Sequence, residues 1–185
     1  MSAALNCNIS FIGGGNMAQA LIGGLIARGL PATRITVSDP VEKVRLLLAE
    51  KEVNVTDDNI AAIKHADIVL FAVKPQVLAD VLKPLHGLLD GKLIISIVAG
   101  AEIATLSSLL GTDRIVRVMP NTPALVQTGA HGLFANADMS TADRELASQV
   151  LASTGLTIWV NSEAQIDAVT AVSGSGPAYF FYMME

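Results

Sequence analysis

The sequence is poor in charged and aromatic residues and contains no long apolar run. Charged residues make up 16% of its 185 positions, against an average of ~25%, and 51% are hydrophobic. The net charge is −5 and no basic stripe is present, which argues against a nucleic-acid partner. The longest apolar runs, around Ile68–Val73 and Leu93–Ala101, fall far short of the roughly 20 residues that span a bilayer, so we expect no membrane partner. The shortage of charge favours an oligomeric contact; a parallel sheet buried on both faces is the alternative explanation.

Cysteine and histidine are also scarce. Cys7 is the single cysteine and cannot form an internal disulfide, which favours a reducing compartment. The first eight residues lack the basic segment of a secretory signal, so we expect a cytoplasmic protein. His65, His86 and His131 show no paired spacing of metal ligands. We therefore predict no metal site and interpret each histidine as a surface or loop residue.

The most informative segment is a strand that runs into a glycine turn and then into a helix. Ile9–Ile12 predicts the strand, Gly13-Gly14-Gly15 the turn, and a helix begins near Asn16. With Ala18, the segment has the G-x-G-x-x-A pattern of dinucleotide-binding turns. In that pattern the second glycine lets the backbone approach a pyrophosphate, which the N–H groups at the helix N-terminus then hold. A glycine-rich turn that binds nothing is the alternative.

Strand and helix patterns alternate in the order that builds a parallel sheet. Strands are predicted at Ile9–Ile12, Ile35–Ser38, Val53–Val55, Asp67–Val73, Leu93–Val98, Ile115–Met119, Leu133–Ala135 and Thr157–Val160. Helices are predicted from Asn16, at Glu42–Lys51, from a cap at Asp57 or Asp58 to Lys64, from Pro75, and at Ile103–Leu110, Thr141–Ser153 and Ala164–Val172. The fold class is therefore α/β, a Rossmann-type, doubly wound and mainly parallel sheet of six strands with two added strands.

The C-terminal segment has a different character. The residue types of Ser173–Pro177 predict a loop, and the apolar run Tyr179–Met184 predicts a helix that has barely begun. Apolar helices that start at the last residues usually continue. We expect residues 1–162 to form a dinucleotide-binding domain, and residues 163–185 to begin an all-helical domain that these residues do not complete.

In an open parallel sheet, ligands bind beyond the carboxyl ends of the strands, at the point where the strand order reverses. Segments rich in small residues fall at four such ends: Gly13–Met17, Ala72–Pro75, Val98–Gly100 and Met119–Pro123. Lys74 could hold an anionic group, or it could extend from the strand end into solvent. Asn121 lies between two prolines, and its spacing alone favours a structural turn.

Asp39 is a candidate for coenzyme recognition. It follows the second strand, 21 positions after Ala18, where an acidic residue binds the ribose 2′-hydroxyl of NAD, although Asp-Pro also makes turns. A carboxylate that faces the ribose would repel a 2′-phosphate; if it faces away, Lys43 or Arg45 could reach that phosphate. No Ser-His-Asp set, Cys-His pair or carboxylate dyad is evident, which suits hydride transfer by a positioned cofactor.

Four segments together resemble the pyrroline-5-carboxylate reductase family: Phe11–Met17, Ala72–Gln76, Val116–Pro123 and Ser173–Tyr179. The Met-Pro-Asn-Thr-Pro and Ser-Gly-Ser-Gly-Pro-Ala-Tyr blocks are specific to that family, whereas the glycine turn is not. The resemblance runs from about Asn8 to the last residue. It implies an oxidoreductase of proline biosynthesis that reduces the small cyclic imine 1-pyrroline-5-carboxylate to L-proline with NADP(H), NAD(H) being the alternative coenzyme. It also implies a homodimer or higher homo-oligomer that assembles through C-terminal helices.

The resemblance further implies two groups of site residues, which Asp39 joins through its spacing. The cofactor-binding group is Ile12, Gly13, Gly14, Gly15, Asn16, Met17, Asp39, Asn59, Ala72, Val73, Lys74, Pro75, Ile97, Val98 and Ala99. The substrate-side group is Met119, Pro120, Asn121, Glu163, Ser173, Gly174, Ser175, Gly176 and Pro177. The resemblance implies that the family's Ser/Thr-bearing loop lies beyond Glu185, so no catalytic residue is assigned. We expect the 185-residue chain to bind dinucleotide but to turn over substrate poorly or not at all. A related Rossmann dehydrogenase or imine reductase, and a non-catalytic dinucleotide-binding module, are the alternatives.

Overall fold

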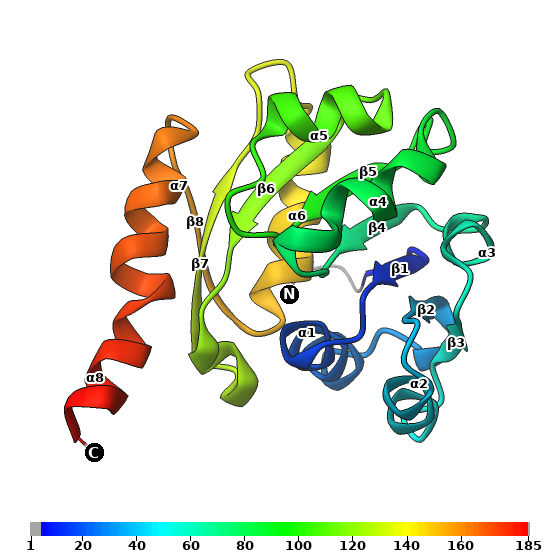
Figure 1. The fold of residues 1–185 in the computed structure, drawn as a ribbon, viewed down its shortest axis with the longest axis horizontal. Coiled ribbons are helices and arrows are strands. Elements are labelled where there is room, and N and C mark those ends of the chain that lie inside the picture. Colours follow the sequence, from blue (N-terminus) through cyan, green and yellow to red (C-terminus); the bar gives the residue numbers. More distant parts are fainter. Residues whose placement is uncertain (1–4, 185) are drawn as a thin grey trace.

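An eight-stranded sheet runs through the centre of the molecule (Figure 1). The structure is a computed structural model that describes residues 5–184. The strands are β1 (Ile9–Ile12), β2 (Ile35–Ser38), β3 (Asn54–Thr56), β4 (Ile68–Phe71), β5 (Leu93–Ser96), β6 (Ile115–Met119), β7 (Gly129–Phe134) and β8 (Gly155–Trp159). Their order across the sheet is β3-β2-β1-β4-β5-β6-β7-β8. The first six pair in parallel, β7 is antiparallel to β6, and β8 is parallel to β7. The predicted Rossmann-type sheet with two added strands is confirmed.

The central strands are mostly apolar because helices cover both faces of the sheet. β4 and β6 are buried at every position. On one face, α1 (Asn16–Ala27), α2 (Glu42–Ala49) and α6 (Thr141–Ala152) pack around Phe11. On the other, α3 (Asn59–Ile63), α4 (Leu78–Leu82) and α5 (Ile103–Leu110) pack around Ile12 and Phe71. Short 3₁₀ turns occupy Ala32–Arg34, Pro75–Val77, Lys83–Leu85 and Thr122–Val126.

Most predicted element boundaries are confirmed to within a few residues. β1, β2, β6 and α5 begin and end as the sequence predicts. Asp58, the second of the two candidate caps, accepts the backbone N–H of Ile60 at 2.8 Å and so begins α3. Pro75 opens a 3₁₀ turn that leads into α4. β7 begins at Gly129, before the predicted Leu133, because β8 pairs with it from Gly155 onward.

The predicted loop at Ser173–Pro177 is wrong, because the chain remains helical there. α7 (Ala164–Val169) passes through a π-helical turn at Thr170–Gly174 into α8 (Gly176–Met184), and together they form a rod at one side of the molecule (Figure 1). The Ser175 N–H donates to the Thr170 carbonyl, five residues back, at 2.9 Å. Pro177 has no N–H for a regular helical bond, and the wider turn accommodates it.

The interpretation of His131 as a surface or loop residue is also wrong. His131 lies within β7, on the same face as Leu133, and is 1% exposed. Its Nε2 is 3.0 Å from Thr154 Oγ1, and its Nδ1 has no hydrogen-bond partner among the described residues. Burial lowers the pKa of His131 to about 4 because the charged imidazolium would lose its hydration.

We therefore expect stability to fall as the pH decreases from about 6.5 to about 4. In the unfolded chain a histidine binds its proton near pH 6.5, whereas folded His131 does so only near pH 4. Between these values the unfolded state binds more protons, so acid favours unfolding, by about 3 kcal/mol over the whole window. Urea titrations across that range measure the effect. His131→Gln should show a flatter pH dependence; an unchanged slope would assign the effect to another group.

No helix within residues 5–184 combines the length and the apolar character that a membrane crossing requires. Within the same residues, no three side chains of the metal-ligating types gather closely enough to hold an ion.

Candidate functional site

The predicted cofactor residues lie in the loops that follow the parallel strands, at one edge of the sheet. The chain passes from β1 to β2 on one side and returns to β4 on the other side of β1. The glycine turn after β1 therefore lies at the topological switch point, where open α/β sheets bind their ligands. The loops that follow β2, β4, β5 and β6 begin at the same edge because these strands are all parallel to β1.

The glycine turn is packed between the ends of β2 and β4. The Gly13 N–H donates to the Ser38 carbonyl at 2.8 Å, and the Ala72 N–H donates to the Ile12 carbonyl at 2.8 Å. Gly13 has φ +100°, and a Cβ there would lie 2.6 Å from the carbonyl oxygen of Ala72. Only glycine fits this position, which brings the first and fourth strands together at the start of the site.

Gly15 has the opposite surroundings. It precedes α1 with φ −65° and ψ 179°, and no side chain among the described residues caps the helix. A Cβ at Gly15 would meet no atom within 4 Å, so the space in front of the helix is open. The first N–H groups of a helix have no partner within it and attract an anion. The geometry of Gly15, Asn16 and Met17 therefore fits a pyrophosphate.

Asp39 supports the glycine turn from the end of β2. Its Oδ2 accepts the Gly14 N–H at 2.8 Å and its Oδ1 accepts the Val41 N–H at 2.9 Å. Arg45 Nη1 donates to the Asp39 carbonyl at 2.7 Å, and Arg45 Nη2 lies 3.9 Å from Asp57 Oδ2. The carboxylate thus faces the turn, and a guanidinium lies beside the same residue. The sequence left open whether Asp39 faces the ribose or makes a turn with a cation nearby. The structure shows Asp39 bonded within the turn and Arg45 beside it.

Asn59 extends the site along β2. It is the first residue of α3, and its Oδ1 accepts the Ser38 hydroxyl at 2.6 Å. Since Ser38 precedes Asp39, the Asn59 side chain lies next to the predicted ribose position. This placement is compatible with its predicted place in the cofactor-binding group.

The loops after β4 and β5 form the neighbouring part of the edge. Ala72 and Val73 are half-buried, and Lys74 and Pro75 are exposed. The Ile97 N–H donates to the Phe71 carbonyl at 3.1 Å, which joins the loop after β5 to the last residue of β4. Val98 is buried and Ala99 is exposed. The exposed members of this set are the ones that a ligand at the edge could contact.

The predicted substrate-side residues come together from segments about 50 positions apart. Asn121 Nδ2 donates to Ser173 Oγ at 3.0 Å, and Asn121 Oδ1 accepts the Ala130 N–H at 2.9 Å. Met119 is buried, and a Cβ at Gly174 would lie 3.6 Å from its sulfur. The corner after β6 thus packs against the π-helical turn. Asn121 supports structure, as its spacing suggested, and it lies within the predicted substrate group.

Glu163 belongs to an ion-pair cluster that sequence reasoning missed. Its Oε1 accepts the Ile103 N–H at 2.8 Å and Arg117 Nη1 at 3.1 Å. Arg117 Nη2 lies 3.0 Å from Asp167 Oδ1. Arg117 is 2% exposed, and its Nε has no partner among the described residues. The cluster ties the start of α7 to β6 and to the first residue of α5. A charged residue inside the apolar strand Ile115–Met119 was the available signal.

Residues 8–100 match the family model described as NADP oxidoreductase, coenzyme F420-dependent, and residues 163–185 match the model described as pyrroline-5-carboxylate reductase dimerisation. A pyrroline-5-carboxylate reductase of Pseudomonas aeruginosa is 51% identical over 180 residues, which cover 96% of this chain and 66% of that protein. The structure of such a reductase from Coxiella burnetii is similar with a TM-score of 0.91 at 42% identity, over 97% of this chain and 68% of that one. One from Plasmodium falciparum, with NADP bound, has a TM-score of 0.85 at 31% identity, over 96% and 66%.

Proposed function

The chain belongs to the pyrroline-5-carboxylate reductase family, and from this we propose that the protein reduces 1-pyrroline-5-carboxylate to L-proline with NADP(H). The observation that carries the proposal is the open, uncapped N-terminus of α1 behind Gly15, at the switch point of the sheet. The chain spans 66% of the length of its Pseudomonas aeruginosa relative, so activity, substrate and partners are all part of the proposal. The reaction would complete proline biosynthesis.

The edge of the sheet offers a place for each part of the dinucleotide. The N–H groups of Gly15, Asn16 and Met17 would hold the pyrophosphate. Asp39 and Asn59 would border the adenosine ribose, and the loops 72–75 and 97–99 would line the cleft. When bound, the reduced nicotinamide supplies the hydride. The NADP bound to the Plasmodium falciparum relative supports this coenzyme.

The chain itself would mainly position the reactants. Asn121 is held by the Ala130 N–H and the Ser173 hydroxyl, so the corner at 119–121 has a defined position against the π-helical turn. A substrate placed between this corner and the nicotinamide would react from one orientation. Such positioning can supply most of the acceleration without a protein nucleophile. The roles of the residues at 119–121, 163 and 173–177 stay predictions.

The C-terminal helices are the proposed oligomer contact. We keep the division into residues 1–162 and a helical domain from 163. The exposed apolar side chains of this part support a homodimer or higher homo-oligomer; they are Val172, Tyr179, Phe180, Phe181, Tyr182, Met183 and Met184. The match of residues 163–185 to a dimerisation model supports the same contact. A cytoplasmic location is also proposed, and the buried thiol of Cys7, whose pKa burial raises to about 11, suits a reducing compartment.

A steady-state assay tests the function. NADPH oxidation is followed with 1-pyrroline-5-carboxylate as the substrate, and proline is identified by mass spectrometry. The assay uses the 185-residue chain and, separately, the protein isolated from its natural source. We expect the protein from the natural source to form proline, and we expect both proteins to bind NADPH. Preferential use of hydroxyacids would favour a related dehydrogenase. NADPH binding without turnover by the protein from the natural source would favour a non-catalytic binding module.

Asp39→Asn should shift the coenzyme preference toward NADPH by about tenfold. The preference is measured as the ratio of the kcat/KM values for NADPH and NADH, with the substitution made in the protein as its natural source produces it. The change removes a negative charge that would repel the 2′-phosphate, and about tenfold corresponds to about 1.4 kcal/mol. Because both coenzymes are tested on the same variant, any loss of folded protein cancels in the ratio. Glu50→Gln, which removes an exposed charge at the end of α2, is the matched control. An unchanged ratio in Asp39→Asn would show that the carboxylate does not face the coenzyme.

A further inference from the structure

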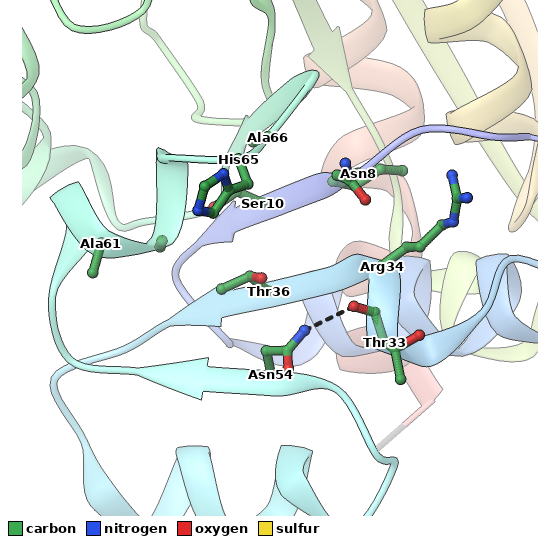
Figure 2. Close-up of a pocket in the computed structure, with 11 residues that line it drawn as sticks. Asn8, Ser10, Thr33, Arg34, Thr36, Asn54, Ala61, His65 and Ala66 are labelled. Atoms are coloured by element: carbon green, nitrogen blue, oxygen red, sulfur yellow. Dashed lines mark hydrogen bonds between the residues drawn. The ribbon is translucent and has the colours of Figure 1, made fainter.

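A separate cavity of about 320 Å³ opens at the amino ends of β1, β2 and β3 (Figure 2). Its walls include Asn8 just before β1, Ser10 within β1, Arg34 just before β2, and His65 after α3. In Figure 2, His65 lies on one side of the cavity and Asn8 and Arg34 lie on the other. Because the strands are parallel, this edge is opposite the glycine turn, and the rise along β1 separates Ser10 from Gly13 by about 10 Å.

The floor of the cavity carries a row of polar side chains. Ser10 pairs in register with Thr36, and Thr36 pairs with Asn54, so the three lie side by side on neighbouring strands. Strands of a parallel sheet are usually apolar at such positions because helices cover them. Here α3 has only five residues, Asn59–Ile63, and it ends before it covers the start of these strands.

Ser10 distinguishes this row from an ordinary solvated edge. It is 0% exposed, and its hydroxyl has no hydrogen-bond partner among the described residues. Buried hydroxyls nearly always have a partner, and one without a partner is destabilising. Hydration would satisfy Thr36, which is partly exposed, and Asn54, which is exposed, but it does not account for Ser10. The buried hydroxyl on the floor points to a group that enters the cavity.

The charges of the lining favour an anion. The cavity is lined by the basic residues Arg34 and His65, and none of the eleven lining residues is acidic. Asp67 is the neighbouring acid; its Oδ2 accepts the Asn8 N–H at 2.7 Å, and Asp67 is not part of the lining. A guanidinium binds carboxylate or phosphate oxygens with paired hydrogen bonds. The volume is at the lower end of the range of about 300–1,000 Å³ for small-molecule sites.

We propose that this cavity binds a small organic anion. Its carboxylate or phosphate oxygens pair with Arg34 and His65, and its polar body lies along the row Ser10, Thr36 and Asn54. The site is distinct from the proposed active site, and the proposal does not depend on the reductase activity.

Titrations followed by NMR of the isotopically labelled protein test the site. Inorganic phosphate and succinate are added separately at constant ionic strength, and the amides of Asn8, Thr36 and Asn54 are observed. Saturable shifts with phosphate assign a phosphorylated ligand, and saturable shifts with succinate assign a carboxylate. Shifts of the Gly15 amide report binding at the other edge and are counted separately. Absence of saturation at these three amides with either probe up to about 50 mM, where a millimolar Kd would saturate, overturns the proposal.

Variants separate the site from general charge effects. Arg34→Gln should weaken binding by about tenfold or more, as expected for the loss of a charge-assisted pair. Lys83→Gln, which removes an exposed positive charge elsewhere, should leave the Kd within about twofold of the unchanged protein. Equal losses in both variants would overturn the assignment of Arg34.

Ser10→Ala gives an independent readout. Removal of an unpaired buried hydroxyl should raise the melting temperature of the ligand-free protein and weaken binding of the probe that saturates. A lower melting temperature would show that the hydroxyl already has a partner within the protein. That result would contradict the role of Ser10 in the proposed site. None of these measurements uses enzyme activity, so failure here leaves the proposed function unaffected.

Discussion

Gly15→Ala should keep the fold and lower the affinity for NADPH by about 100-fold, or roughly 2.7 kcal/mol. The backbone of Gly15, at φ −65° and ψ 179°, is open to any residue, and the added Cβ meets no protein atom within 4 Å. That methyl group would instead occupy the space in which the pyrophosphate approaches the N–H groups of α1. The expected result is an unchanged melting temperature and a large loss of coenzyme binding in a fluorescence or calorimetric titration.

Two glycines provide matched controls for this prediction. Gly23 lies within α1 and also has open space around an added Cβ, so Gly23→Ala should keep full affinity and gain up to about 1 kcal/mol of stability from helix propensity. Gly13→Ala should lose stability as well as binding, because its Cβ would lie 2.6 Å from the Ala72 carbonyl oxygen. If Gly15→Ala bound NADPH as well as Gly23→Ala does, the pyrophosphate could not lie at this helix.

Arg117→Met should destabilise the protein by about 3 kcal/mol. Arg117 is buried and pairs with Glu163 and Asp167. Its removal leaves the half-buried carboxylate of Glu163 without its cation and releases the start of α7 from β6. The free energy of unfolding from urea titrations measures the loss. Hydrogen exchange in α7 (Ala164–Val169) should increase more than exchange in the central strands.

The partners of Arg117 differ in exposure, which separates burial from charge. The Asp167 side chain is 70% exposed, so Asp167→Asn should cost less than about 1 kcal/mol. Glu163→Gln retains an oxygen that can accept the Ile103 N–H, and its effect should fall between the two. Equal effects of Asp167→Asn and Arg117→Met would contradict a buried ion pair as the origin of the stability.

The Arg117 cluster also shows a limit of local patterns. The sequence marks Arg117 only as a charge within an apolar strand, and it marks Glu163 only through family resemblance. Neither pattern indicates that the two side chains meet, because they are 46 positions apart. Their contact depends on β7 and β8 bringing the chain back so that α7 lies against β6.

Local sequence patterns were enough to predict the order of strands and helices along the chain, the glycine turn at the switch point and the family. These follow from hydrophobic period, from turn-forming residues and from motifs, which act over a few neighbouring positions. Tertiary structure alone decided that His131 is buried, that Ser173–Pro177 stays helical, that Asn121 meets Ser173, and that Ser10, Thr36 and Asn54 share one row. These depend on strand register and on which helix covers which face, and both are set by contacts between segments far apart in the chain.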